Sequence, residues 1–276
     1  MIKDIVVSLS VAEGGGFAGD FAISVAAALK GHLTGIAFVY DPIIPAAAVG
    51  YLSPQVIEAQ QRDSANAAQA ALDRFFAAAA RAGISVDAVK LRASDADAGE
   101  QFGQIARRFD LAIVGQAEPG KDAAEAEIAE GALFESGRPV VMVPYIQKAP
   151  LKLDRVMVCW DGSRAAARAI ADAMPLLARA GRVEVVIVAD DPGKRHEIPG
   201  ADMGRHLARH ALEVNVTRLA AGDIDVADAL LSHAADSGVD FIVMGGFGHS
   251  RLREFVLGGV TRSILRAMTA PVLMSH

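Results

Sequence analysis

The chain has 276 residues, 52% of them hydrophobic and 22% charged, with a formal net charge of −6. This length suits two domains of ordinary size, and the composition excludes intrinsic disorder. Residues 1–150 carry 12 Lys and Arg against 18 Asp and Glu, whereas residues 151–276 carry 15 of each. The negative excess in the first half argues against nucleic acid as a partner and makes the second half the better host for an anion.

The sequence shows no sign of a secreted or membrane protein. Its start, MIKDIVVSLSVAEGGG, has a short apolar core with an early acid, unlike a signal peptide. The apolar stretch 42–52 is far shorter than the roughly 20 residues that span a bilayer. The single cysteine, Cys159, excludes an intrachain disulfide and a cysteine-rich metal cluster. We therefore expect a cytoplasmic protein without a membrane partner.

The predicted elements recur in the same order in the two halves. The first half has expected strands at 2–9, 110–115 and 138–145 and helices at 18–31 and 101–109; their counterparts lie at 153–160, 240–245, 270–276, 163–181 and 226–238. Each half then reads β-α-β-α-β-α-β-α-β, with strands apolar on both faces, which is typical of a parallel sheet covered on both sides. We predict two tandem doubly wound α/β domains, 1–147 and 151–276, rather than two unrelated α/β domains.

The halves differ by an insertion in the first. The loop PIIPAAAVGYL (42–52) precedes a long alanine-rich helix predicted at 54–82. The loop is either an exposed surface for a partner or second subunit, or a flap over the first domain's own helices. The closing strands 138–145 and 270–276 are expected at sheet edges, where unpaired backbone favours β-pairing.

A glycine-rich stretch, GGFGHSRLREFVLGGVT, occupies residues 245–261 after the strand 240–245. Ligands of open α/β sheets collect beyond the carboxyl ends of the strands, and glycine lets the backbone approach them closely. Gly258 and Gly259 would open the last helix, whose free N–H groups favour a phosphate. Hydroxyl and cationic groups are supplied by Ser250, Thr261, Arg251 and Arg253. The alternative is a set of tight turns without a ligand.

The motif CWDGS places Asp161 at the same carboxyl edge, with Ser163 at the start of the next helix. A carboxylate there can accept hydrogen bonds from an exocyclic amine or a ribose hydroxyl. The alternative is a helix N-cap, for which Asp and Ser are both favoured.

Asp161, Ser163 and VMGGFGHSRLREFVLGGVTRSIL together resemble the universal stress protein family, in a tandem form with two fused domains. The resemblance implies a five-stranded parallel sheet in each domain, of the adenine nucleotide alpha hydrolase-like type, and a regulatory stress-response protein. It also implies that ATP or another adenine nucleotide binds, with Mg²⁺ accompanying its phosphates. The implied site residues are Asp161, Ser163, Val188, Gly245, Gly248, His249, Ser250, Arg251, Gly258, Gly259, Val260 and Thr261.

One position departs from the family pattern, because Gly259 stands where a Ser or Thr is expected. Loss of one hydroxyl hydrogen bond costs about 0.5–1.5 kcal/mol, which weakens a site without abolishing it. ADP and AMP are therefore candidates beside ATP.

The first half is expected to bind no nucleotide. Glu118 replaces the second glycine, no acid matches Asp161, and further acids crowd the loop at Asp122, Glu125, Glu127 and Glu130. These carboxylates would repel a phosphate. The stretch GQAEPGKD (115–122) nearly spells a P-loop, but Asp122 replaces the hydroxyl residue that should hold magnesium.

The sequence gives only weak indications of metal binding, cysteine chemistry or nucleotide hydrolysis. His206 and His210 have i, i+4 spacing, with Asp202 nearby, but no third ligand is assured, so we expect no metal site. Cys159 is expected to be inert packing. No general base is visible, so we expect at most a weak ATPase. The alternative function is an interaction protein with both sites empty, and a homodimer and an unidentified protein partner stay open.

Overall fold

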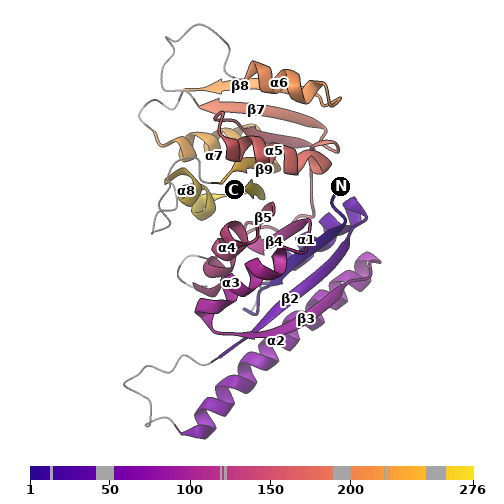
Figure 1. Ribbon diagram of the computed structural model, residues 1–276, viewed down its shortest axis with the longest axis vertical. Helices are drawn as coiled ribbons and strands as arrows, with labels where there is room; N and C mark the ends of the chain where they lie inside the picture. The colour runs from indigo at the N-terminus through magenta and orange to yellow at the C-terminus, as the bar shows by residue number, and fades with distance from the viewer. Residues whose placement is uncertain are drawn as a thin grey trace. The chain divides into compact units, whose positions relative to one another are not determined.

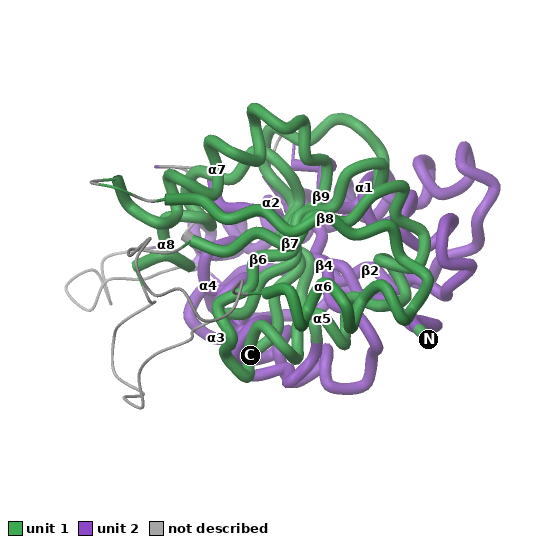
Figure 2. Tube along the Cα trace, turned by 90° about the horizontal axis from the view of Figure 1, so that it is seen from above, with its two compact units in different colours: residues 1, 139–276 green, residues 2–138 purple. Residues whose placement is uncertain are grey.

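The computed structural model has ten strands and eight helices among the residues it describes, which divide into two compact units, 2–138 and 139–276 with Met1 (Figures 1 and 2). The described residues are 1–12, 15–41, 53–118, 120, 123–188, 200–220, 222, 224–246 and 259–276. In the part of the chain that is described, no helix is both long enough and apolar enough to cross a membrane.

The N-terminal unit is an α/β sandwich. Its elements are β1 (Asp4–Leu9), α1 (Phe17–Leu29), β2 (His32–Tyr40), α2 (Pro54–Ala82), β3 (Asp87–Ala93), α3 (Asp95–Ala106), β4 (Leu111–Gly115) and α4 (Ala123–Glu135). The strands lie in the order β3-β2-β1-β4, and the register shows β1 parallel to both of its neighbours. Helix α1 contacts α2, and α3 contacts α4 (Figure 1). The connections through α1 and α2 run one way along the sheet and the connection through α3 runs back, so right-handed crossovers put the two helix pairs on opposite faces.

The C-terminal unit repeats this plan. Its elements are β5 (Val140–Val143), β6 (Arg155–Cys159), α5 (Arg164–Leu177), β7 (Arg182–Val188), α6 (Ala201–Ala208), β8 (Val214–Leu219), α7 (Val226–Asp236), β9 (Phe241–Gly245), α8 (Gly259–Ala267) and β10 (Val272–Ser275). The strand order is β10-β9-β6-β7-β8, all parallel, which confirms the expected five-stranded sheet in this half. The predicted α/β architecture with alternating helices and parallel strands is therefore confirmed.

Strand β5 belongs to the C-terminal compact unit, although it closes the first half of the repeat. It pairs antiparallel with β10, with Met142 opposite Val272 and Val140 opposite Met274. All four of these side chains are buried. The pairing satisfies edge backbone groups that would otherwise be exposed, as expected for two closing strands.

The repeat extends to single side chains. Asp110, just before β4, accepts hydrogen bonds through Oδ2 from the N–H groups of Lys3 and Asp4 at 2.7 and 3.1 Å. Asp240, just before β9, accepts in the same way from Asp154 and Arg155 at 3.1 and 3.2 Å. Each aspartate therefore fixes the start of the central strand of its unit. Burial raises the pKa of Asp240, and the backbone hydrogen bonds oppose this shift.

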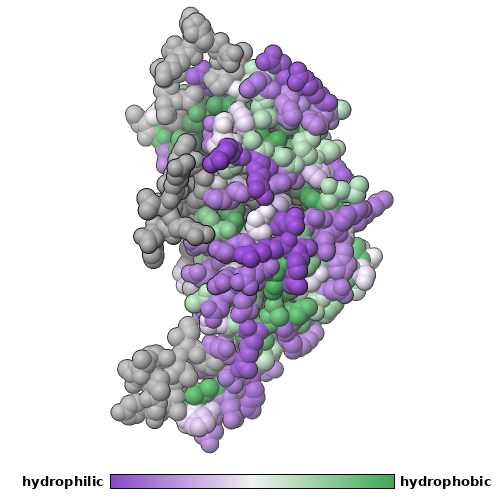
Figure 3. All heavy atoms as spheres, in the orientation of Figure 1, coloured by the Kyte–Doolittle hydropathy of each residue, from purple (hydrophilic) through white to green (hydrophobic). Residues whose placement is uncertain are grey.

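The cores are built from the central strands. Every residue of β4, β5 and β10 is buried, because both faces of these strands are covered. In the outer strands β3 and β8, by contrast, most side chains are exposed or partly exposed to solvent. The face of the molecule in Figure 3 is mostly hydrophilic over the described helices, with scattered apolar atoms, which is ordinary for a folded protein.

Helices α3 and α4 approach each other closely through three glycines. A Cβ added to Gly131 would lie 2.8 Å from the Cα of Gly99, with the carbonyl group of Gly99 nearer still. A Cβ on Gly103 would lie 2.5 Å from the carbonyl oxygen of Gly131. The two helix backbones are therefore in direct contact, and Gly131 serves helix packing.

Candidate functional site

The carboxyl edge of the C-terminal sheet brings several of the predicted site residues to one level. In the register, Cys159 of β6 lies opposite Val186 of β7, so Asp161 is level with Val188. On the other side of β6, Val158 lies opposite Val243, which places Gly245 at the level of residue 160. Neighbouring strands are about 4.8 Å apart, so three strand ends form one rim.

This rim is also where the strand order reverses. From β6 the chain proceeds outward through β7 and β8, then returns to the other side of β6 with β9 and β10. Ligands of open α/β sheets bind at such a switch point, because the helices on either side diverge there. Asp161 follows β6 and Gly245 ends β9, the two strands that flank the switch point. We call the carboxyl ends of β6, β7 and β9 the C-terminal rim.

Gly245 is in contact with the first turn of α5. A Cβ at this position would lie 2.5 Å from the amide nitrogen of Ala166 and 2.7 Å from the carbonyl carbon of Ala165. Glycine is therefore required by the packing of β9 against α5. Ala165 and Ala166 were not among the predicted site residues, although the run of small residues after Ser163 is a signal for such a close approach.

Asp161 and Ser163 order the turn between β6 and α5. Oδ1 of Asp161 accepts from the N–H of Ser163 at 2.8 Å, and Oγ of Ser163 accepts from the N–H of Ala166 at 3.1 Å. Gly162 between them has φ of +76°, which favours glycine. Ser163 is thus the N-cap of α5. Asp161 is exposed, so capping leaves its carboxylate accessible to solvent and ligands.

Helix α8 begins at Gly259, as the sequence indicated for the glycine pair 258–259. Because β10 runs parallel to β9, α8 must return from the carboxyl edge, so its N-terminus lies on the side of the rim. Gly259 is exposed, Val260 is partly exposed and Thr261 is buried. The predicted residues Gly248, His249, Ser250, Arg251 and Gly258 lie outside the described residues.

Cys159 is adjacent to the C-terminal rim, but its thiol is unreactive at neutral pH. Desolvation by the surrounding protein, and secondly the charge of Asp161, raise the pKa of its thiol to about 12. The thiolate is the reactive form of cysteine, so the thiol is inert at neutral pH. This agrees with the expectation that Cys159 serves packing.

We expect Cys159 in the native protein to react with iodoacetamide at pH 8 at least about a hundredfold more slowly than in the urea-unfolded chain. Mass spectrometry of the alkylated protein over time measures both rates. Asp161→Asn should raise the native rate by less than about tenfold, because desolvation is the larger cause. Native and unfolded rates within tenfold of each other would contradict the assignment.

At the carboxyl end of β4 in the N-terminal unit, side chains lie against the glycine that corresponds to Gly245. A Cβ on Gly115, at the end of β4, would lie 3.0 Å from Cζ of Phe17 and 3.5 Å from a carboxylate oxygen of Glu125. Phe17 is the first residue of α1 and occupies the place that small residues hold beside Gly245. An aromatic ring and a carboxylate thus lie beside this glycine, where the other half has the backbone of Ala165 and Ala166. The expectation that the first half binds no nucleotide stays a prediction, and the carboxylate of Glu125 would repel a phosphate at this place.

The other candidates do not assemble into a site. His206 and His210 are exposed, with ring centroids 5.0 Å apart. Within the described part of the chain, no group of three or more His, Cys, Asp or Glu is placed to hold a metal ion. Of the stretch that resembles a P-loop, Pro119, Lys121 and Asp122 lie outside the described residues, as does the loop 42–52.

Residues 152–276 match the model of the universal stress protein family. The C-terminal half of the chain is thus similar to this family. It is 39% identical over 46 residues to universal stress protein Slr1230 of Synechocystis sp., and 38% identical over 47 residues to universal stress protein MJ0577 of Methanocaldococcus jannaschii. Each alignment covers 17% of this chain, and they cover only 16% and 29% of those two relatives.

The fold of the whole chain is that of a solved universal stress protein. A structure from Archaeoglobus fulgidus DSM 4304 superposes with a TM-score of 0.72, covering 98% of this chain and 97% of the other at 18% identity. A putative universal stress protein from Pseudomonas aeruginosa UCBPP-PA14 superposes with a TM-score of 0.55 at 16% identity. At these identities the likeness concerns the fold. Both halves of the chain are thus covered by the likeness in fold.

Proposed function

We propose that this chain is a tandem universal stress protein that binds an adenine nucleotide at the C-terminal rim, with one site per chain and a regulatory role in a stress response. The observation that carries the proposal is the alignment of three strand ends at the switch point of the sheet, with exposed Asp161 after β6 and the exposed start of α8 at Gly259 on the same side. The free N–H groups at the start of α8 can point at a bulky anion bound beside these strand ends.

The described residues of the C-terminal rim can contact the ribose, the base and the phosphates of a nucleotide. Asp161 is exposed and ionisable, and its carboxylate can accept hydrogen bonds from a ribose hydroxyl or an exocyclic amine. Val188 is partly exposed at the end of β7, one strand away, and offers apolar contact to a base. Gly259 presents the N-terminus of α8 to the phosphates, where the helix dipole favours negative charge. Mg²⁺ would accompany the phosphates of ATP or ADP.

A binding role is favoured over catalysis by the chemistry of the same residues. Oδ1 of Asp161 already accepts a hydrogen bond from the turn that it orders. The thiol of Cys159, two residues earlier, stays protonated at neutral pH because its pKa is about 12. The thiol is therefore not available as a general base at neutral pH. We therefore expect a nucleotide sensor with at most slow hydrolysis.

Isothermal titration calorimetry with ATP, ADP and AMP, with and without Mg²⁺, tests the proposal. At least one nucleotide should bind with a stoichiometry of one per chain. Asp161→Ala should weaken binding about tenfold, the value of one hydrogen bond to a charged group. Asp236→Ala, at the exposed far end of α7, removes the same charge and should leave affinity unchanged. Absence of binding with all three nucleotides would favour an interaction protein whose sites are empty.

Gly259→Ser should tighten nucleotide binding about fivefold, because it restores the hydroxyl that the family pattern has at this position. A Cβ added at Gly259 meets no atom within 4 Å of the described structure, so the side chain fits without rearrangement. The same titration measures the effect. Gly259→Ala adds the Cβ without the hydroxyl and should not tighten binding. Equal affinities for the serine and alanine variants would show that no phosphate group lies at α8.

A further inference from the structure

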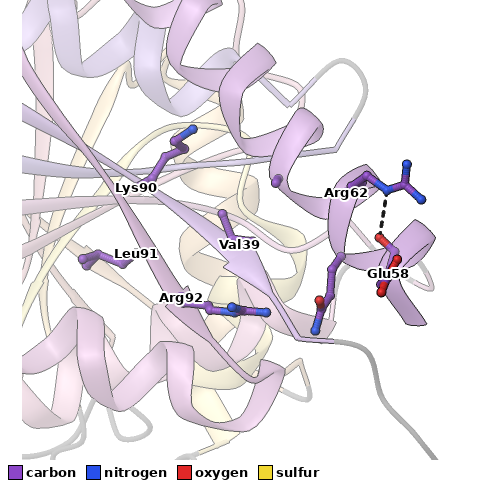
Figure 4. Close-up of a pocket in the computed structure, with 8 residues that line it drawn as sticks. Val39, Glu58, Arg62, Lys90, Leu91 and Arg92 are labelled. Carbon is purple, nitrogen blue, oxygen red and sulfur yellow. Dashed lines mark hydrogen bonds between the residues drawn. The ribbon is translucent and has the colours of Figure 1, made fainter. Parts of the chain in front are cut away.

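An open groove lies on the N-terminal unit, between the first half of α2 and the ends of β2 and β3 (Figure 4). Its cavity volume is about 440 Å³, within the range of small-molecule sites. The helix contributes Glu58, Gln61, Arg62 and Ala65, and the strands contribute Val39, Lys90, Leu91 and Arg92. We call this the α2–β3 groove.

The groove gathers positive charge in the acidic half of the chain. Three of the 12 Lys and Arg of residues 1–150 line it, against one carboxylate, that of Glu58. Arg62 donates through Nε to the backbone oxygen of Glu58 at 3.3 Å, and Lys90 donates through Nζ to Oε1 of Gln69 at 2.8 Å. Both of these partners are uncharged oxygens, and among the described residues no carboxylate forms an ion pair with either cation.

The third cation is differently placed. Nε of Arg92 lies 2.8 Å from Oδ1 of Asp41, and both side chains are about half exposed. This ion pair fixes the guanidinium at the strand side of the groove, although exposed pairs of this kind contribute little stability. The net charge of the groove, counting Asp41, is still positive.

Apolar surface lies beside these charges. Val39 at the end of β2 is partly exposed and faces α2, where the small side chain of Ala65 leaves room (Figure 4). The aliphatic stems of lysine and arginine extend this surface. The helix is held at this point, because Oγ of Ser64 accepts from the N–H of Tyr40 at 2.7 Å. The groove is therefore shaped by fixed elements with an apolar floor and cationic sides.

We propose that the α2–β3 groove binds a small amphipathic organic anion, of which a medium-chain carboxylate is the simplest example. The apolar body lies against Val39 and Ala65, and the acid group pairs with Lys90. Charge-assisted hydrogen bonds to the acid group give specificity over neutral amphiphiles. This site is in a different unit from the C-terminal rim and does not depend on nucleotide binding there.

Displacement of the fluorescent sulfonate 8-anilino-1-naphthalenesulfonate from the full chain tests the proposal. Octanoate should displace the probe at concentrations at which neutral 1-octanol and inorganic phosphate do not. Displacement should persist in Asp161→Ala and in the presence of saturating ADP, which separates this site from the C-terminal rim. Equal potency of octanoate and octanol, or displacement by phosphate alone, would overturn the assignment.

Two pairs of variants locate the site, with circular dichroism confirming that each variant is folded. Lys90→Gln should weaken octanoate binding about tenfold, whereas Arg108→Gln, exposed elsewhere on the same unit, removes the same charge without effect. Ala65→Phe should block the groove, whereas Ala80→Phe, exposed near the other end of α2, should not. Equal effects within either pair would overturn the proposal.

Discussion

Gly131→Ala is expected to lower the free energy of unfolding by about 3 kcal/mol or more, the range of severe overpacking in a close-packed interior. The added Cβ would lie 2.8 Å from the Cα of Gly99, and the carbonyl group of Gly99 would be closer still. These are backbone atoms inside α3, so no side-chain rotation can relieve the overlap. The two helices must move apart, and the buried contacts between them are lost. Urea denaturation followed by circular dichroism measures the change.

Gly16→Ala is the matched control for this prediction. Gly16 precedes α1 in the same unit, has φ of −72°, and a Cβ there meets no atom within 4 Å. Its effect should stay within about 1 kcal/mol, because only backbone entropy and a weak capping preference change. If Gly131→Ala lowered the free energy of unfolding no more than Gly16→Ala does, α3 and α4 would not be in the close contact described.

Gly245→Ala is expected to destabilise the C-terminal unit by about 2–4 kcal/mol and to abolish measurable nucleotide binding. Its Cβ would lie 2.5 Å from the amide nitrogen of Ala166, which belongs to the capped first turn of α5. Relief requires β9 and α5 to separate, and this opens the switch point where the nucleotide is proposed to bind. Urea denaturation and calorimetry with ATP, ADP and AMP measure the two effects.

Alanine substitutions at two other glycines of the same unit are controls with smaller expected effects on stability. Gly162→Ala should cost about 1–2 kcal/mol, because φ of +76° is unfavourable for alanine although the space around it is open. Gly259→Ala should be close to neutral, since its position is open and begins a helix. A Gly245→Ala variant as stable as Gly259→Ala, with nucleotide affinity intact, would refute both the packing role and the proposed site.

The order and type of the elements were predictable because periodicity reports burial. The helix expected at 54–82 is α2 (Pro54–Ala82), and the strand expected at 240–245 is β9 (Phe241–Gly245). A strand covered on both faces must be apolar at every position, and a helix on a sheet must be apolar every three to four residues. The repeated Asp before β4 and β9 also marked two equivalent places.

The candidate site was predictable only in part. The motif CWDGS indicated Asp161 at a strand end, and the register places it level with Val188. The sequence could not separate glycines that open a ligand site from glycines that allow close packing. Gly131 packs against Gly99, and Gly245, one of the predicted site glycines, contacts α5. Both uses need the same property, the absence of Cβ, so composition cannot distinguish them.

The amino-acid sequence alone determined the two-fold repeat, the α/β class and the chemical contrast between an acidic first half and a glycine-rich second half. These follow from local patterns, since each residue's polarity reflects the face on which it lies. Tertiary structure decided what each small or charged residue touches: Phe17 against Gly115, β5 beside β10, and the cations of the α2–β3 groove across from Val39. Such contacts join residues far apart in the chain, and their distances depend on how the helices pack on the sheet.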